Sequence, residues 1–127
     1  MFLMLSLVAL NNRDLLAQRL AVPNYVTCDR NQLTSWQGQI TKIEREQVGV
    51  KVWIATDDGT NEVLNLTMPG WKEVLGQFRL RDKSFHASDW ESLFDSNGKL
   101  KAGVRAVIWL CNTEGVSPVI NWQLPSQ

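Results

Sequence analysis

The chain is poor in the residues that build metal centres and catalytic sites. Of its 127 residues only His86 is a histidine, and its two cysteines, Cys28 and Cys111, stand far apart with no Cys-x-x-Cys pair. A structural zinc site therefore lacks ligands, and no pattern in the sequence calls for a cofactor. The cysteines are either two buried free thiols or one disulfide, and a disulfide requires an oxidising compartment.

The sequence also lacks a net charge, because thirteen basic residues balance thirteen acidic ones. Binding driven by attraction to phosphate groups is therefore not favoured, which argues against nucleic acid or anionic lipid as the main partner. No Gly-rich phosphate loop is present either. An apolar share of 44% and a charged share of 20% are ordinary for one soluble domain of this length.

No apolar run is long enough to span a bilayer as a helix. Residues 1–10 (MFLMLSLVAL) resemble the apolar part of a secretory signal peptide, which Ala17 or Ala21 would end, although no Lys or Arg precedes them. Export predicts a periplasmic or secreted protein with a disulfide. The alternative is a cytoplasmic protein with free thiols, in which an amphipathic helix packs on the domain through Leu5, Val8, Leu15, Leu16 and Leu20.

The chain does have strand-forming sequence from residue 33 onwards. Residues 103–111 (GVRAVIWLC) are the most strand-like run, and further strands are expected at 35–46, 48–56, 62–67 and 117–124. Gly38 inside the first of these indicates a bulge or tight bend. The Asp58-Gly59 pair predicts a hairpin with a type I′ turn. Residues 71–75 suit one helical turn, and residues 78–85 suit either a short strand or a loop.

A helix is expected before the last two strands. Ser88 fits an N-cap with Glu91 at capping-box spacing, and Gly98 ends the helix. The order is then three strands, a helix and two strands. We therefore expect an N-terminal segment and connector at residues 1–32 and one mainly β domain at residues 33–127.

This order resembles the OB-fold, a five-stranded Greek-key barrel with a helix between its third and fourth strands. Residues 36–46, 48–67, 89–96, 101–111 and 119–124 carry the resemblance. The chain also resembles small, uncharacterised exported bacterial proteins built on such barrels. The resemblance implies a module that binds oligonucleotides, oligosaccharides or protein partners, and it implies no catalytic residue.

One face of the predicted barrel carries a candidate binding stripe. If the aliphatic residues of each strand point inward, a polar and aromatic set points outward: Gln39, Lys51, Trp53, Arg105 and Trp109. Such a surface stacks sugars or bases. The alternative is that the N-terminal segment covers the stripe, and a Cys28–Cys111 bridge on the same face would tie that segment down.

An enzyme is the less favoured class. Ser84 and His86, with Asp82 or Asp89, contain the residue types of a hydrolase triad, but they crowd into one stretch without a nucleophile elbow. The sequence therefore predicts a non-enzymatic binding or interaction module of the cell envelope, whose partner is a protein or a small polar ligand. A single-stranded nucleic-acid or oligosaccharide binder is the alternative.

Overall fold

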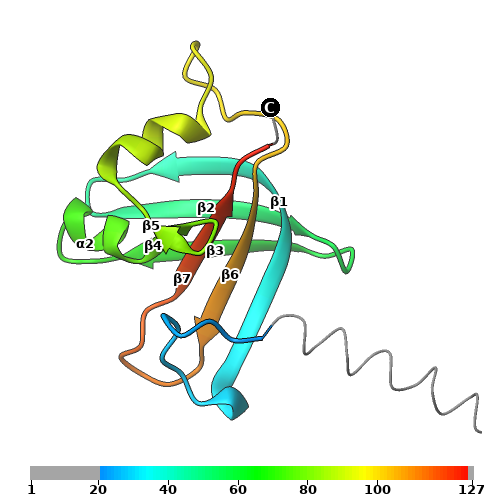
Figure 1. The fold of residues 1–127 in the computed structure, drawn as a ribbon, viewed down its shortest axis with the longest axis vertical. Coiled ribbons are helices and arrows are strands. Elements are labelled where there is room, and N and C mark those ends of the chain that lie inside the picture. Colours follow the sequence, from blue (N-terminus) through cyan, green and yellow to red (C-terminus); the bar gives the residue numbers. More distant parts are fainter. Residues whose placement is uncertain (1–20, 126–127) are drawn as a thin grey trace, which may run out of the picture.

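The computed structural model describes residues 21–125, which form one curled sheet with short helical segments (Figure 1). The prediction of a mainly β protein with one short helix is confirmed. The α-helix is Trp71–Gly76, however, and the helix expected at residues 89–96 is a 3₁₀ helix, Ala87–Leu93, which ends well before Gly98. The predicted signal peptide and its alternative, the packed helix, fall on residues 1–20 and so lie outside the described residues. Within residues 21–125, no helix is long and apolar enough to cross a membrane.

Seven strands make up the sheet. They are β1 (Leu33–Arg45), β2 (Gly49–Thr56), β3 (Asn61–Thr67), β4 (Phe78–Leu80), β5 (Lys83–Ser84), β6 (Arg105–Cys111) and β7 (Val119–Gln123). The helical segments are the α-helix α2 (Trp71–Gly76) and two 3₁₀ helices, η1 (Arg30–Gln32) and η2 (Ala87–Leu93). The strand order is β3-β2-β1-β6-β7-β4-β5, and all neighbours are antiparallel except β4 and β7.

Five of these strands lie in the order that the resemblance implies, because β2 and β6 both pair with β1, and β7 pairs with β6. The five-stranded closed barrel is not confirmed, since the sheet has seven strands and its end strands β3 and β5 do not pair. Residues 78–84, which the sequence left ambiguous, form a hairpin whose first strand pairs with β7. A closed five-stranded barrel would pair β7 with β3. Here β4 occupies that edge of β7 instead, so the sheet stays open.

β1 is the strand that curls the sheet. In Figure 1 it bends along its length, so that one part lies beside β2 and the other beside β6. The register shifts between Ile40 and Lys42, so the bulge predicted at Gly38 is displaced along the strand. Gly38 has a different role: a Cβ there would lie 2.1 Å from the carbonyl oxygen of Ala55, so only glycine permits this approach of β2.

The core lies on the inner face of the sheet, against α2 and η2. The predicted alternation is confirmed in β2 and β3, whose inward residues are buried: Val50, Val52, Ile54, Leu64 and Leu66. In β6 the inward Ala106 and Ile108 are buried, but so are Val107 and Trp109 on the other face. Val74 of α2 and Leu93 of η2 are also fully buried in this core. Trp122 and Phe78 are its largest members, and their rings meet edge to face at 5.4 Å.

Two local predictions need correction. The β2–β3 hairpin is confirmed, but Thr56 and Thr60 pair at its base, so three residues form the loop and only Gly59 has a positive φ. This is the three-residue loop with a left-handed glycine, not a type I′ turn. The second correction concerns η2, which starts after His86: the Asp89 carboxylate accepts the backbone N–H of His86 at 2.7 Å, in place of a cap at Ser88.

Candidate functional site

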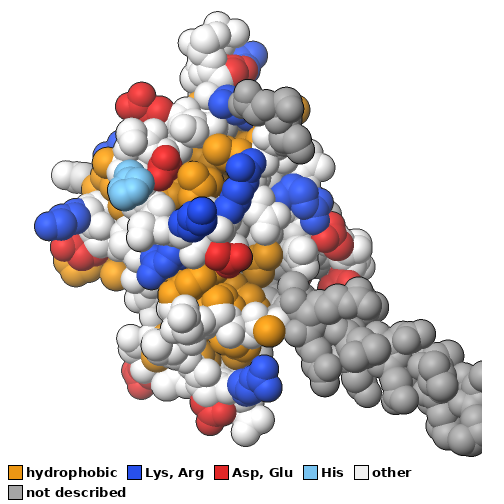
Figure 2. All heavy atoms as spheres, in the orientation of Figure 1, with side chains coloured by type: hydrophobic (Ala, Val, Ile, Leu, Met, Phe, Trp, Pro, Cys, Tyr) orange, Lys and Arg blue, Asp and Glu red, His pale blue; other side chains and the backbone are white. Residues whose placement is uncertain are grey.

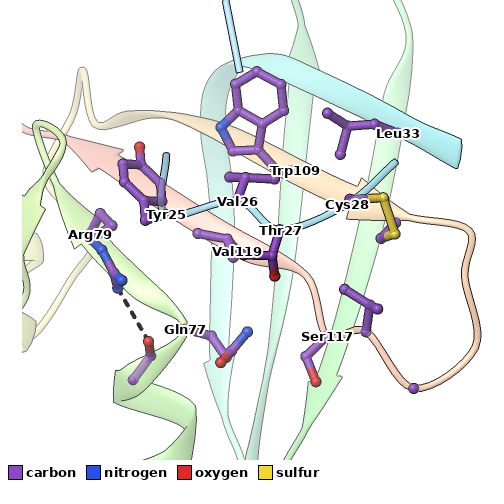
Figure 3. A pocket seen from close by; sticks show the side chains of 14 residues that line it. Tyr25, Val26, Thr27, Cys28, Leu33, Gln77, Arg79, Trp109, Ser117 and Val119 are labelled. Atoms are coloured by element: carbon purple, nitrogen blue, oxygen red, sulfur yellow. Dashed lines mark hydrogen bonds between the residues drawn. A yellow bond between two sulfur atoms is a disulfide. The ribbon is translucent and has the colours of Figure 1, made fainter. Parts of the chain in front are cut away.

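Residues 22–28, here called the strap, cross the outer face of the sheet. One end is fixed by Cys28, whose sulfur lies at disulfide distance, 2.01 Å, from that of Cys111 at the end of β6. Closer to the N-terminus, the Tyr25 hydroxyl donates a hydrogen bond of 2.7 Å to Asp82 Oδ1. In Figure 3 Tyr25 and the disulfide lie on opposite sides of the view, with Trp109 of β6 between them.

The predicted cysteine pair is therefore present in the structure, and it fits an oxidising, extracytoplasmic setting. It joins the strap to the strand that the sequence singled out as the most strand-like. The strap also covers that strand: Trp109 is only 6% exposed.

A polar cluster holds the strap at Tyr25. Asn121 of β7 is 4% exposed, and its side-chain amide forms two hydrogen bonds with Asp82: Nδ2 donates to Oδ1 at 3.1 Å, and Oδ1 accepts the Asp82 backbone N–H at 2.9 Å. A buried amide that is satisfied in this way fixes the position of its partner. Asp82 is thus held in place to receive the tyrosine hydroxyl.

Asp82 also sits in an uncommon backbone conformation. Arg81 and Asp82 form the two-residue turn between β4 and β5 with φ values of 50° and 69°, and each costs roughly 1 kcal/mol in a non-glycine residue. The Arg81 backbone N–H donates to the carbonyl of Trp122, and its guanidinium donates to that of Leu124. These bonds and the amide of Asn121 hold the strained turn against β7.

The environment of Tyr25 keeps its hydroxyl protonated. Burial raises the pKa of this phenol well above its usual value, and the hydrogen bond and negative charge of Asp82 raise the pKa further. The Arg79 guanidinium opposes them, since its carbon lies 4.9 Å from the centre of the Tyr25 ring. The hydroxyl is therefore a hydrogen-bond donor throughout the neutral and mildly alkaline range.

Two cavities flank the strap. The first, of about 350 Å³, is shown in Figure 3; its side chains include Tyr25, Thr27, Gln77, Arg79, Trp109, Ser117 and Val119. The second, of about 410 Å³, is lined in part by Gln37, Asp82, Val107 and Asn121. Tyr25 and Trp109 line both cavities, so these two aromatic side chains stand between them. Both volumes lie in the range of small-molecule sites.

Arg79 is the charged group of the first cavity. Its Nη1 donates to the carbonyls of Gly76 and Phe78, at 3.2 and 2.9 Å, and these bonds orient the guanidinium. Its other N–H groups have no hydrogen-bond partner within residues 21–125. The site thus offers directed donors from one positive group beside two aromatic side chains. Figure 2 shows basic side chains next to hydrophobic ones on this side of the molecule.

The predicted stripe residues do share one face. Gln39 pairs with Arg105 on one side and with Ala55 on the other, and Trp53 and Lys51 follow Ala55 on β2 at the same parity. The stripe is nevertheless not continuous. Trp53 pairs with Lys42, whereas Trp109 pairs with Ser35, so the two tryptophans are roughly 20 Å apart along β1.

The members of the stripe also have different surroundings. Trp53 is half-buried, with the ammonium groups of Lys42 and Lys51 at 4.8 and 5.1 Å from its ring centre. Arg105 forms an ion pair with Asp57 of the β2–β3 loop. Their role in ligand binding stays a prediction, as does that of Gln39, while the covering of Trp109 by the strap follows the alternative raised from the sequence.

The structure does not assemble the residues of the hydrolase alternative. The Asp89 carboxylate accepts the backbone N–H of His86, and Asp82 is taken up by Tyr25 and Asn121. No hydrogen bond within the described part of the chain joins the imidazole to Ser84. Residues 21–125 likewise contain no group of three or more metal-ligating side chains.

Sequence reasoning missed the residues that build the strap site: Tyr25, Arg79, Asp82 and Asn121. Tyr25 is the only tyrosine of the chain, and this was the one feature of the sequence that could have pointed to the site. In comparisons with known proteins, no family model, no curated protein and no solved structure matches this chain. A function must therefore be argued from the geometry.

Proposed function

We propose that the protein is a non-enzymatic binding module of an oxidising compartment of the cell envelope, and that it takes a small polar ligand beside the strap. The observation that carries this proposal is the cavity of about 350 Å³ between the strap and the outer face of the sheet. Its walls are fixed by a disulfide at one end and by the Tyr25–Asp82 hydrogen bond at the other. A preformed site of this kind orders little on binding.

The lining indicates the chemistry of the ligand. Arg79 supplies N–H donors in a planar arrangement that suits a carboxylate or neighbouring hydroxyl groups. Thr27 and Gln77 add polar groups, and Trp109 adds an apolar wall. We therefore propose a ligand about the size of an amino acid or a monosaccharide that carries a carboxylate or several hydroxyls.

In fold terms we propose an OB-like module rather than a closed OB barrel. The order β3-β2-β1-β6-β7 supports the relationship, and the helical segments α2 and η2 cover the inner face of the sheet. In this arrangement the ligand site lies on the outer face of β6 and β7, where the strap crosses.

The test is calorimetric titration of the full chain with a panel of free amino acids, uronic acids and monosaccharides. We expect Arg79→Gln to weaken binding at least tenfold, because a hydrogen bond to a charged group contributes about 1.5–3 kcal/mol. Lys51→Gln is the matched control, since it removes one positive charge from the same face outside the cavity. Equal affinities of wild type and Arg79→Gln would overturn the proposed site.

A second candidate is a single-stranded nucleic-acid or oligosaccharide binder that uses Trp53. The observation in its favour is the placement of Lys42 and Lys51 near the Trp53 ring, which suits stacking of a base beside two phosphate-binding groups. Here Lys51→Gln would weaken binding of an oligo-dT or a linear oligosaccharide, and Arg79→Gln would not. For DNA, the affinity would also fall steeply with salt.

A hydrolase is the least favoured function. It predicts that His86→Ala abolishes a detectable hydrolytic activity. A binding module predicts instead that His86→Ala leaves ligand affinity unchanged, because His86 lines neither of the two cavities beside the strap.

A further inference from the structure

The outer strand β3 is an open edge of the sheet. It is the last strand in the order β3-β2-β1-β6-β7-β4-β5, and its only ladder within residues 21–125 is with β2. The hydrogen bonds from Met68 to Val48 and from Thr56 to Thr60, at the two ends of this ladder, fix which residues of β3 bond to β2.

Because paired residues alternate along an antiparallel ladder, the residues bonded to β2 are the even-numbered ones: Glu62, Leu64 and Leu66. The backbone N–H and C=O groups of the odd-numbered residues therefore point away from the sheet. They belong to Asn61, Val63, Asn65 and Thr67. No partner for these groups exists within the described part of the chain.

The two edges of the sheet differ in how they are protected. β5 is only two residues long, contains Lys83 and follows a strained turn, all of which hinder a further strand. β3 is seven residues long and contains no Lys, Arg or Pro. Of the two exposed large hydrophobic residues among residues 21–125, Val63, at 41%, lies on this edge strand, and Val48, at 38%, lies on the side of the neighbouring strand β2, where it pairs with Met68.

We propose that β3 pairs antiparallel with β3 of a second copy of this chain, so that two seven-stranded sheets join into one. A two-fold axis at Leu64 sets the register: Val63 then faces the partner's Asn65, and Asn61 faces the partner's Thr67. In this register every outward N–H and C=O of one strand meets its complement on the other. No shift of either strand is needed.

Charge and side chains also suit a second copy. Glu62 is the one charged residue of β3, and it would face the partner's Leu66 rather than another acid. The whole chain has no net charge, so two copies do not repel each other at long range. On the outer face, Val63 of each copy would be covered at the junction beside Trp53, with which it pairs on β2.

The test is sedimentation equilibrium of the full chain over a wide concentration range. We expect a monomer–dimer equilibrium that Asn65→Lys weakens at least tenfold, because a lysine at an edge opposes strand addition. Gln39→Lys is the matched control: it adds the same charge at an exposed position of the same face, but on the central strand β1. Circular dichroism confirms that both variants fold.

A disulfide test checks the register. In the double variant Val63→Cys and Asn65→Cys, oxidation should give a covalent dimer linked through two bonds, whereas Gln39→Cys should give none. A protein that stays monomeric at all concentrations overturns the proposal. Hydrogen exchange of the Val63 and Asn65 amides in that monomer would then show the state of the edge. Unprotected amides would mean that the edge is free for an extended peptide of another protein, and protected amides would mean that the same chain covers it. Neither result affects the strap site.

Discussion

Removing the Cys28–Cys111 disulfide by the double substitution Cys28→Ala and Cys111→Ala should strongly destabilise the protein. The bond spans a sequence separation of 83 residues and so restricts most of the unfolded chain. The chain-entropy relation for a loop of this length gives about 4.5 kcal/mol at 25 °C. That is a large part of the stability of a domain of this size. The same bond anchors the strap over Trp109, so its loss should also expose this indole.

The assay is urea unfolding followed by circular dichroism, with and without a reducing agent. We expect the wild type under reducing conditions to approach the stability of the double variant, and we expect the variant not to respond to the reductant. A loss below about 1 kcal/mol would refute the reasoning that loop closure stabilises this fold. Two free thiols in wild-type protein purified from an oxidising compartment would refute the pairing itself.

The remaining predictions concern single side chains. Tyr25→Phe should cost about 1 kcal/mol at pH 7, since it removes a partly exposed hydrogen bond to Asp82. The folded-state pKa of Tyr25 is raised, so its contribution is complete below the unfolded pKa of about 10 and is lost as pH rises above it. Urea unfolding at pH 9 and pH 11 should therefore show a steeper loss for wild type than for Tyr25→Phe, and parallel losses would contradict the assignment. Gly38→Ala should cost at least about 2 kcal/mol in the same assay, because the new Cβ meets the Ala55 carbonyl at 2.1 Å. The control Gly76→Ala lies in α2 with open space around it and should be neutral or stabilising by up to about 1 kcal/mol, so equal effects of the two substitutions would refute the steric argument.

The sequence predicted those parts of the fold that depend on local alternation. Val50, Val52 and Ile54 recur at every second position, and a strand with that pattern can bury only one face. The pairing of the first strand with two neighbours was expected from the resemblance to the OB-fold, because side-chain parity alone does not give a strand order. The first strand was expected at residues 35–46 and is found at Leu33–Arg45. It bends, and it pairs on both sides, as expected.

The hairpin of β4 and β5 could not be predicted in the same way. β4 has three residues and β5 has two, too few for a period to appear, and their turn uses Arg81 and Asp82 in a conformation that favours glycine or asparagine. Contacts with β7 and Asn121 decide this conformation. Because those contacts come from residues about 40 positions away, no local pattern reveals them.

The strap site depends on the same long-range contacts. Cys28 and Cys111 were recognisable as a possible pair because the chain has no other cysteine. Tyr25 and Asp82, in contrast, are 57 residues apart and come from a connector and a turn. The outer-face stripe was correctly placed on one face, but the separation of Trp53 from Trp109 depends on the register along β1, which parity alone does not give.

The central claim is that the strap cavity, and not the Trp53 surface, binds the ligand. The most direct test is a two-dimensional ¹H–¹⁵N spectrum of the full chain titrated with a ligand from the calorimetric panel, with the six indole N–H signals assigned by single Trp→Phe variants. We predict that the Trp109 signal shifts with ligand concentration while the Trp53 signal stays in place. A shift of Trp53 with an unchanged Trp109 would contradict the claim.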